Sequence, residues 1–303
     1  MSRIHEALKK AAQERAAQSG ENGKELIEFV ETGAAPPPIP ASPAINSEAG
    51  HKSSTSGSTS AYESFVAKCK RVEWQTEARY SAFADETANR AGAEKFRTLR
   101  SRLYQIASVQ PLKRILLTSS VPEEGKTFVT LNLAQSFVRQ AERKALLVDA
   151  DLRASRLHVA LGAPSRPGLT EYLRGELSLS DVMQVGTTGN LCFIPGGGEV
   201  SNPSELLHSD KMKELLEIVT PHFDWILLDS PPSIAVHDAS ALADMCDGVL
   251  FVVRAGMTDF EVAKKAAAEF QEKNLLGVIL NRVEKSETYG DYYYGYSRER
   301  GDL

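Results

Sequence analysis

The sequence predicts an α/β fold, with a mostly parallel sheet covered by helices on both faces and a largely flexible N-terminal extension. Strand-like and helix-like segments alternate from Arg114 onward, and several strand candidates, such as residues 145–148, are apolar throughout. Strands that are apolar on both faces and separated by helices are typical of a parallel sheet between two helical layers. The candidate strands are residues 114–118, 144–149, 190–194, 224–229, 248–253 and 276–280.

The composition suits a folded core. The chain has 303 residues, 42% hydrophobic and 25% charged, which indicates one ordinary domain with extensions or at most two small domains. The net charge of -5 argues against a nucleic-acid partner, and Cys69, Cys192 and Cys246 lie too far apart to predict a disulfide framework or a metal cluster. No apolar run reaches the roughly 18 to 20 residues of a membrane span. We therefore expect a cytoplasmic protein that reaches a membrane only through a partner.

The first ninety residues differ in composition from the rest. Residues 2–18 predict a short helix whose thin apolar stripe (Ile4, Leu8 and Ala11) either docks on a partner or frays in solvent. Residues 31–60 are rich in Pro and Ser, as linkers are, and residues 61–90 are ambiguous. We divide the chain into an N-terminal helix (1–30), a linker with an uncertain segment (31–90), a main domain (91–285) and a tail (286–303).

Residues 93–106 predict an amphipathic helix. Its apolar side chains recur at helical spacing and should face the core: Phe96, Leu99, Leu103 and Ile106. Glu94, Arg97 and Arg100 step by three around another side. This stripe either contacts a neighbouring subunit, since Arg binds carboxylates in two-pronged fashion, or is a solvated face with local ion pairs. Spacing alone favours the solvated face.

Residues 119–127 predict a phosphate-binding loop. An apolar strand precedes them and a helical pattern follows, which is the context of a P-loop. The first amides of that helix point at a bound anion, Lys126 adds a positive charge, and Thr127 offers a hydroxyl to Mg²⁺. Ser120 stands where the usual pattern has Gly, and we expect Glu123 and Glu124 to face solvent, because a carboxylate in the loop would repel phosphate. The residues assigned to nucleotide binding are Ser120, Glu124, Gly125, Lys126, Thr127, Phe128, Arg153 and Asn281.

Three aspartates follow strands of the predicted sheet. Asp149 and Asp151 come after the second strand, and Asp229 comes after the fourth. Since ligands bind beyond the carboxyl ends of parallel strands, these carboxylates should meet the P-loop there. We assign catalysis to Lys126, Asp149, Asp151 and Asp229, and metal binding to Thr127, Asp149 and Asp229. For each aspartate, capping of a following helix is the alternative.

Four further polar residues near these strand ends have less specific patterns. Arg153 either contacts phosphate or braces the aspartates, and Asn281 either meets a base edge or serves as a turn residue. His158 and His237 have no partner at metal-ligand spacing, so we expect them to be structural.

The C-terminal tail holds five of the nine tyrosines, at positions Tyr289, Tyr292, Tyr293, Tyr294 and Tyr296. Their spacing is neither helical nor alternating, so their phenols should be exposed. A nucleotide site with spare carboxylates, on a chain that ends in accessible phenols, suggests phosphoryl transfer to tyrosine. Docking of an aromatic tail on a partner fits the composition equally well.

The chain resembles the bacterial tyrosine kinases of capsule and exopolysaccharide export over residues 94–296. The resemblance rests on five matches in order, with residues 202–207 also similar: Glu94-x-x-Arg97-x-x-Arg100, the loop at residues 120–127, Asp149-x-Asp151-x-Arg153, residues 227–232 and the tyrosine cluster. It implies a P-loop fold akin to that of partitioning ATPases, with ATP and Mg²⁺ at Walker motifs. It also implies a ring formed through the Glu94/Arg97/Arg100 stripe, with each tail phosphorylated in a neighbouring subunit. A separate membrane chain-length regulator would activate the kinase, and a tyrosine phosphatase would reverse it.

The sequence departs from the family pattern in two places, and two other functions remain as alternatives. Glu123 replaces a Gly often found after Pro122, and residues 1 to about 90 lie outside the resemblance. A partitioning or division-site ATPase shares the predicted sheet but carries an additional Lys early in the loop, where this chain has Val121. A nucleotide-switched adaptor of an export complex is the third possibility.

Overall fold

The computed structural model describes residues 61–85, 87, 89–140 and 142–283. The chain divides into two units, Met1–Ser58 and Thr59–Leu303, and only the second contains described residues. The predicted helix at residues 2–18, the linker at 31–60 and the tyrosine tail therefore lie outside the described residues.

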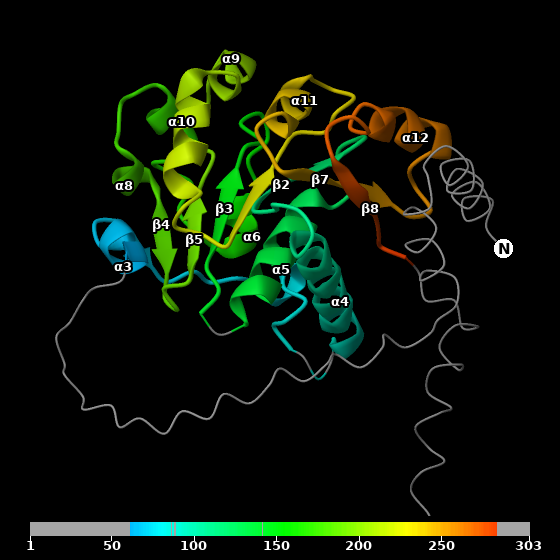
Figure 1. Ribbon diagram of the computed structural model, residues 1–303, viewed down its shortest axis with the longest axis horizontal. Coiled ribbons are helices and arrows are strands. Elements are labelled where there is room, and N and C mark those ends of the chain that lie inside the picture. The colour runs from blue at the N-terminus through cyan, green and yellow to red at the C-terminus, as the bar shows by residue number, and fades with distance from the viewer. Residues whose placement is uncertain (1–60, 86, 88, 141, 284–303) are drawn as a thin grey trace, which may run out of the picture. The chain divides into compact units, whose positions relative to one another are not determined.

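The second unit is built on one eight-stranded sheet in the order β1-β4-β5-β3-β6-β2-β7-β8 (Figure 1). All neighbouring pairs are parallel except β4 with β5. The sheet confirms the predicted fold class and all six predicted strands. The strands are β1 Lys70–Val72, β2 Arg114–Ser119, β3 Ala145–Asp149, β4 Gln184–Gly186, β5 Leu191–Ile194, β6 Trp225–Asp229, β7 Gly248–Arg254 and β8 Leu275–Asn281.

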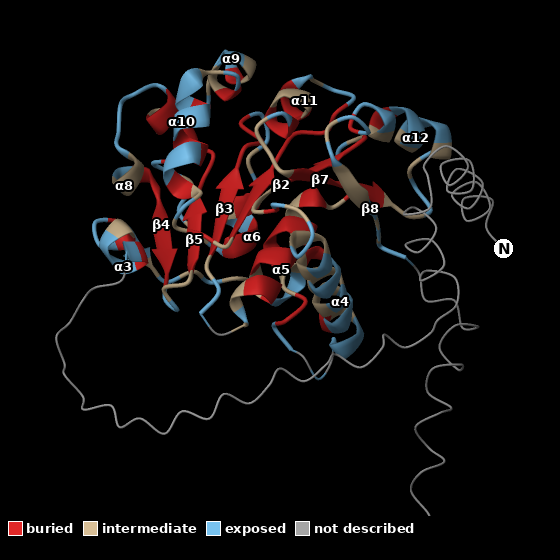
Figure 2. Ribbon diagram, in the orientation of Figure 1, coloured by how far each residue is buried: buried red, intermediate tan, exposed pale blue. Residues whose placement is uncertain are grey.

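The central strands are buried along their length between two layers of helices (Figure 2). Helices cover both faces of the sheet because these strands carry apolar side chains on both sides. Leu146 and Val148 belong to one apolar cluster, whereas Leu147 between them belongs to the other. The first cluster packs under α3 Ala61–Val66, α7 Leu169–Leu173, α8 Leu179–Val182, α9 Pro203–Leu207, α10 Asp210–Val219, α11 Asp238–Ala243 and α12 Phe260–Ala268. The second packs under α4 Arg90–Ala107, α5 Lys126–Val138 and α6 Leu157–Leu161.

The segment before α4, which the sequence left ambiguous, packs on this domain. It contains α3, β1 and a short 3-10 helix, η2 Ala78–Tyr80, and it buries Tyr62, Val66 and Phe83. Asn132 of α5 joins it to the P-loop helix: its amide donates to the Tyr80 carbonyl (2.9 Å), and its oxygen accepts from the Ala82 amide (2.6 Å). The packed unit thus reaches well upstream of residue 91.

Helix α4 lies along α5, and its apolar side faces the core as predicted. Leu103 is buried, with Phe96, Leu99 and Ile106 partly buried against the same cluster. Within the described residues, no helix is long and apolar enough to cross a membrane.

Candidate active site

The carboxyl ends of three adjacent strands form the candidate site. Strands β3, β6 and β2 are neighbours in the sheet, and the P-loop follows β2. Asp149 and Asp229 end β3 and β6 and are direct register partners, so parallel pairing alone places these two carboxylates side by side. The structure therefore brings together the loop and the aspartates that the sequence assigned to one edge.

The P-loop presents the start of α5 to this edge. Gly125 is the residue before the helix and has a left-handed backbone (φ 94°), and it has no side chain that could occupy the free amides of the first turn. Lys126 is the first residue of α5 and only 8% exposed. Phe128 turns away to pack on Phe96 of α4, with the ring centres 6.0 Å apart. This geometry suits an anion at the helix N-terminus, with Lys126 beside it.

Asp229 connects β6 to that first turn. One carboxylate oxygen accepts from the Thr127 hydroxyl (2.6 Å), and the other accepts from the Thr130 hydroxyl (3.2 Å). Burial raises the pKa of the Asp229 carboxyl, while nearby Lys126 and the hydrogen bond from Thr127 oppose the rise. A buried carboxylate against a threonine hydroxyl is a donor set that Mg²⁺ prefers.

Asp149 is fully buried, and its side chain also orders the loop that follows β3. Its carboxylate accepts from the Ser155 hydroxyl (2.7 Å), the Leu157 amide (3.0 Å) and the Asp151 amide (3.3 Å). Burial raises the pKa of Asp149, and the negative charge of Asp229 raises it further. The helix-capping alternative is therefore partly realised here, because Leu157 begins α6.

Asp151 is slightly more accessible than Asp149. It is 8% exposed, against 0% for Asp149, and it accepts from the amide of Ala154 (3.0 Å). His158 lies 3.4 Å from the Ser155 hydroxyl, and burial lowers the pKa of this histidine. Among the described residues, no three His, Cys, Asp or Glu side chains are arranged to hold a metal by themselves. Mg²⁺ at Thr127 and Asp229 would thus need phosphate and water oxygens as further ligands, which is its habit in nucleotide sites.

The expectation for the two loop glutamates is half right. Glu123 is exposed, as expected, and has a left-handed backbone (φ 65°). The expectation for Glu124 is wrong, because its side chain is fully buried. It points away from solvent into a set of hydrogen-bond donors, among them the Ser120 hydroxyl (3.0 Å), and these donors compensate the cost of burial. Ser120 thus donates a hydrogen bond to Glu124 that a Gly at this position could not make.

Arg153 and Asn281 make structural contacts. Arg153 donates to Asp238 (3.0 Å) at the start of α11 and to the Ser204 hydroxyl (2.8 Å) in α9, so it connects two surface helices to the loop after β3. Asn281, the last residue of β8, donates to the carbonyl of Glu124 (2.9 Å). Both were assigned to nucleotide binding, and in this structure each side chain has another polar partner.

The predicted oligomer stripe has local partners. Glu94 and Arg97 form an ion pair (2.8 Å), and Arg100 donates to the Ser136 carbonyl of α5 (2.6 Å). The five tail tyrosines lie outside the described residues.

Comparison with a family model assigns a protein with this geometry to a class. The CobQ/CobB/MinD/ParA nucleotide binding domain matches residues 115–301. The septum site-determining protein MinD of Pyrococcus horikoshii OT3, solved with Mg-ADP, is 26% identical with a TM-score of 0.50, over 58% of this chain and 72% of that one. Fold and site thus define a P-loop nucleotide-binding domain of the MinD/ParA class.

Tyrosine kinases are among the relatives within that class. Tyrosine-protein kinase YwqD of Bacillus subtilis is 37% identical over 67% of this chain and 86% of its own length. Tyrosine-protein kinase Etk of Escherichia coli is 35% identical over 64% of this chain, which spans only 27% of Etk. The solved Etk kinase domain has a TM-score of 0.59 at 32% identity, over 66% of this chain and 80% of that one. The chain belongs to the bacterial tyrosine kinase family, which confirms the resemblance found in the sequence.

Proposed function

We propose that this tyrosine-protein kinase transfers the γ-phosphoryl group of ATP, with Mg²⁺, to tyrosines of its own C-terminal cluster. Each subunit would phosphorylate the tail of a neighbouring copy of the chain. This reaction would regulate capsule or exopolysaccharide polymerisation and export. The observation that carries the proposal is the meeting of Lys126, Thr127, Asp149 and Asp229 at one edge of the sheet. Phosphoryl transfer depends mainly on positioning and charge neutralisation, which is what these groups supply.

Each residue has a role that follows from its place. Lys126 and the free amides of α5 bind the outer phosphates. Thr127 and Asp229 hold Mg²⁺, which neutralises phosphate charge when it is bound. Asp149 is register partner to Asp229 and keeps the loop after β3 in place through Ser155.

Asp151 is our candidate for the group that accepts the phenol proton. A phenol with a pKa near about 10 needs an acceptor in order to become a nucleophile at neutral pH. The Asp149 carboxylate has three donors and no exposed surface, whereas Asp151 is 8% exposed and follows it by two residues. Asp151 is therefore the better placed of the two to meet an incoming tyrosine.

Membership of the family supports a proposal for assembly and partners. We propose a ring in which Glu94, Arg97 and Arg100 contact a neighbour, with Arg100 giving up its bond to Ser136 for that contact. A structure described as the chimerical protein CapA2B2 matches 74% of this chain at 26% identity, with a TM-score of 0.64. A separate membrane chain-length regulator would recruit the kinase to the inner face of the membrane, and a tyrosine phosphatase would reset it.

A partitioning-type ATPase is the second candidate, because the MinD similarity favours the same nucleotide site. The two differ in the acceptor, which is water in one case and tyrosine in the other. Val121 stands where those ATPases carry their additional Lys, which supports the kinase.

A mixing experiment tests the proposal. One full-length chain carries Lys126→Met, and a second carries Phe at all five tail tyrosines with its active site intact. Incubation of the mixture with Mg-ATP should add phosphate to the Lys126→Met chain, as intact-mass spectrometry would show, whereas neither chain alone should gain any. If the mixture releases free phosphate and neither chain gains mass, the ATPase alternative is correct.

A further inference from the structure

The side chain of Glu124 is a buried carboxylate inside a phosphate-binding loop. Four groups donate to it: the hydroxyls of Thr258 (2.6 Å) and Ser120 (3.0 Å), and the amides of Val121 (2.8 Å) and Arg254 (3.4 Å). We call this set the Glu124 network. A buried carboxylate is tolerated only when its oxygens are satisfied, and each charge-assisted bond is stronger than a neutral one. The network therefore fixes the position of Glu124 firmly.

The network joins parts of the chain that are distant in sequence. Ser120 and Val121 belong to the loop itself, whereas Arg254 ends β7 and Thr258 lies before α12. These two partners are 130 and 134 residues from Glu124. The loop is thereby held to a neighbouring strand and not only to the strand from which it emerges.

The main chain of Glu124 has a partner of its own. Asn281 donates to its carbonyl oxygen at 2.9 Å, and the Asn281 oxygen accepts from the Arg282 amide at 2.9 Å. The approach is close, because a Cβ atom at Gly125 would lie 2.0 Å from the Asn281 nitrogen. Asn281 therefore fits beside Gly125 only because this position has no side chain, and it orients the peptide that leads into α5.

We propose that Glu124 and Asn281 are positioning residues that set the phosphate-binding conformation of the loop before nucleotide arrives. Glu124 acts through Thr258 and the end of β7, and Asn281 acts through the Glu124 carbonyl. Preorganised amides bind phosphate more tightly, because the loop does not lose conformational entropy when the phosphate binds. The left-handed backbone of Glu123 needs such support, since a residue with a side chain disfavours that conformation. The inference rests on the proposed function only in that the site binds ATP phosphates.

Thr258→Val is the first test, because it removes one donor on the far side of the loop. The affinity of the full chain for Mg-ADP, measured by calorimetry, should fall about tenfold, the effect of losing one hydrogen bond to a charged group. The Mg-ADP affinity of Glu124→Gln should fall at least as far, because a side-chain amide cannot accept from all four donors. Thr220→Val is the matched control: its hydroxyl donates to the Leu216 carbonyl at 2.5 Å, at the C-terminal end of α10. It should leave the Mg-ADP affinity within about twofold.

Asn281→Leu separates positioning from recognition of the base. Mg-tripolyphosphate, which has phosphates and no base, is used to displace a fluorescent ADP analogue. A positioning role predicts that the variant binds tripolyphosphate about tenfold more weakly, whereas a base contact predicts unchanged tripolyphosphate binding and weaker ADP binding. Asn190→Leu is the control, because its amide donates to the Val138 carbonyl (2.9 Å) at the other end of α5.

The outcomes distinguish this inference from the proposed function. Wild-type Mg-ADP affinity in folded Thr258→Val and Glu124→Gln would overturn the role of Glu124, and wild-type tripolyphosphate affinity in Asn281→Leu would overturn that of Asn281. Absence of phosphotyrosine in the mixing experiment would overturn the kinase proposal and leave these affinities as they are. Thermal unfolding of each variant shows that it is folded.

Discussion

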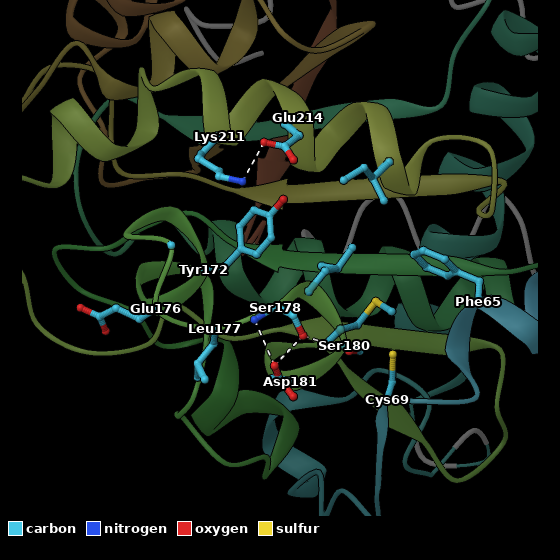
Figure 3. Close-up of a pocket in the computed structure, with 14 residues that line it drawn as sticks. Phe65, Cys69, Tyr172, Glu176, Leu177, Ser178, Ser180, Asp181, Lys211 and Glu214 are labelled. Atoms are coloured by element: carbon cyan, nitrogen blue, oxygen red, sulfur yellow. Dashed lines mark hydrogen bonds and ion pairs between the residues drawn. The ribbon is translucent and has the colours of Figure 1, made fainter.

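Two regions of the molecule gather polar side chains: the carboxyl edge of β2, β3 and β6, and a hollow of about 630 Å³ bordered by α3, α7, α8 and α10 (Figure 3). In the hollow the charges are paired and exposed, as in the ion pair of Lys211 with Glu214 (2.9 Å), whose side chains are 45% and 50% exposed. At the sheet edge, Asp149 and Asp229 are 0% and 1% exposed and lie side by side. The difference teaches that the cost of burying like charges marks the chemical site better than the size of a cavity.

Of the substitutions that test this comparison, Asp229→Asn should have the largest effect on the rate of tail phosphorylation. It removes the carboxylate that holds Thr127 and the metal, so the rate of tail phosphorylation should fall by about two to three orders of magnitude. The rate is measured by intact mass at fixed Mg-ATP. Lys211→Met in the hollow is the control and should leave the rate within experimental error. Equal losses in both variants would remove the distinction between the two regions.

The pH dependence of stability sharpens the same contrast. The raised pKa values of Asp149 and Asp229 mean that the folded state holds protons which the unfolded state has released. The stability that these bound protons contribute to the folded state is fully present below the ordinary carboxyl pKa, and it is lost as pH rises through the raised pKa values of the folded state. Between the ordinary carboxyl pKa of about 4 and the raised folded values, the nucleotide-free protein should thus lose up to about 1.4 kcal/mol of unfolding free energy per pH unit for each such proton.

Urea denaturation at several pH values measures this slope. Asp149→Asn should flatten it, because an amide does not titrate, and saturating Mg-ADP should reduce it, because bound cation favours the ionised carboxylates. A stability that rises with pH over this range, in the absence of nucleotide, would contradict the burial argument.

Glu123→Gly should have the smallest effect. Glycine adopts the left-handed conformation at this position without the steric cost that a side chain brings. We expect the unfolding free energy to rise by about 0.5–1 kcal/mol, and the melting temperature by about 1–4 °C. Differential scanning calorimetry measures both. Glu142→Gly, at a second exposed residue with φ 66°, is the matched control and should behave alike.

Much of the fold and of the candidate site follows from local sequence. Central strands such as β3 and β6 are runs of apolar residues that end in Asp, and this pattern predicts both the sheet and the carboxylates at its edge. Strands β1 and β4 were missed because each has three residues, and β1 contains Lys70 and Arg71. Their strand character comes from pairing with each other and, for β4, also with β5, and not from their own pattern.

The site residues whose partners the sequence did not predict have those partners far away in sequence. Electrostatic reasoning put Glu124 in solvent because it considered only the phosphate, while the hydroxyl that binds the side chain, on Thr258, lies 134 residues later. Arg153 likewise meets Asp238, 85 residues away. Periodicity reports which face of an element is buried, but it does not report which donors another element brings to that face.

The hydrogen bonds from Asn132 to the segment at Tyr80 and Ala82 bear on how this enzyme can be shortened. Asn132 lies six residues after Lys126 on one rigid helix, a distance of about 9 Å at 1.5 Å per residue. A chain cut at residue 91 would remove both of these bonds and leave the Asn132 side chain only its bond to the Phe128 carbonyl (2.8 Å), on the same helix that carries the phosphate-binding lysine. Excision of a minimal catalytic fragment should therefore begin ahead of Ala61, where α3 starts.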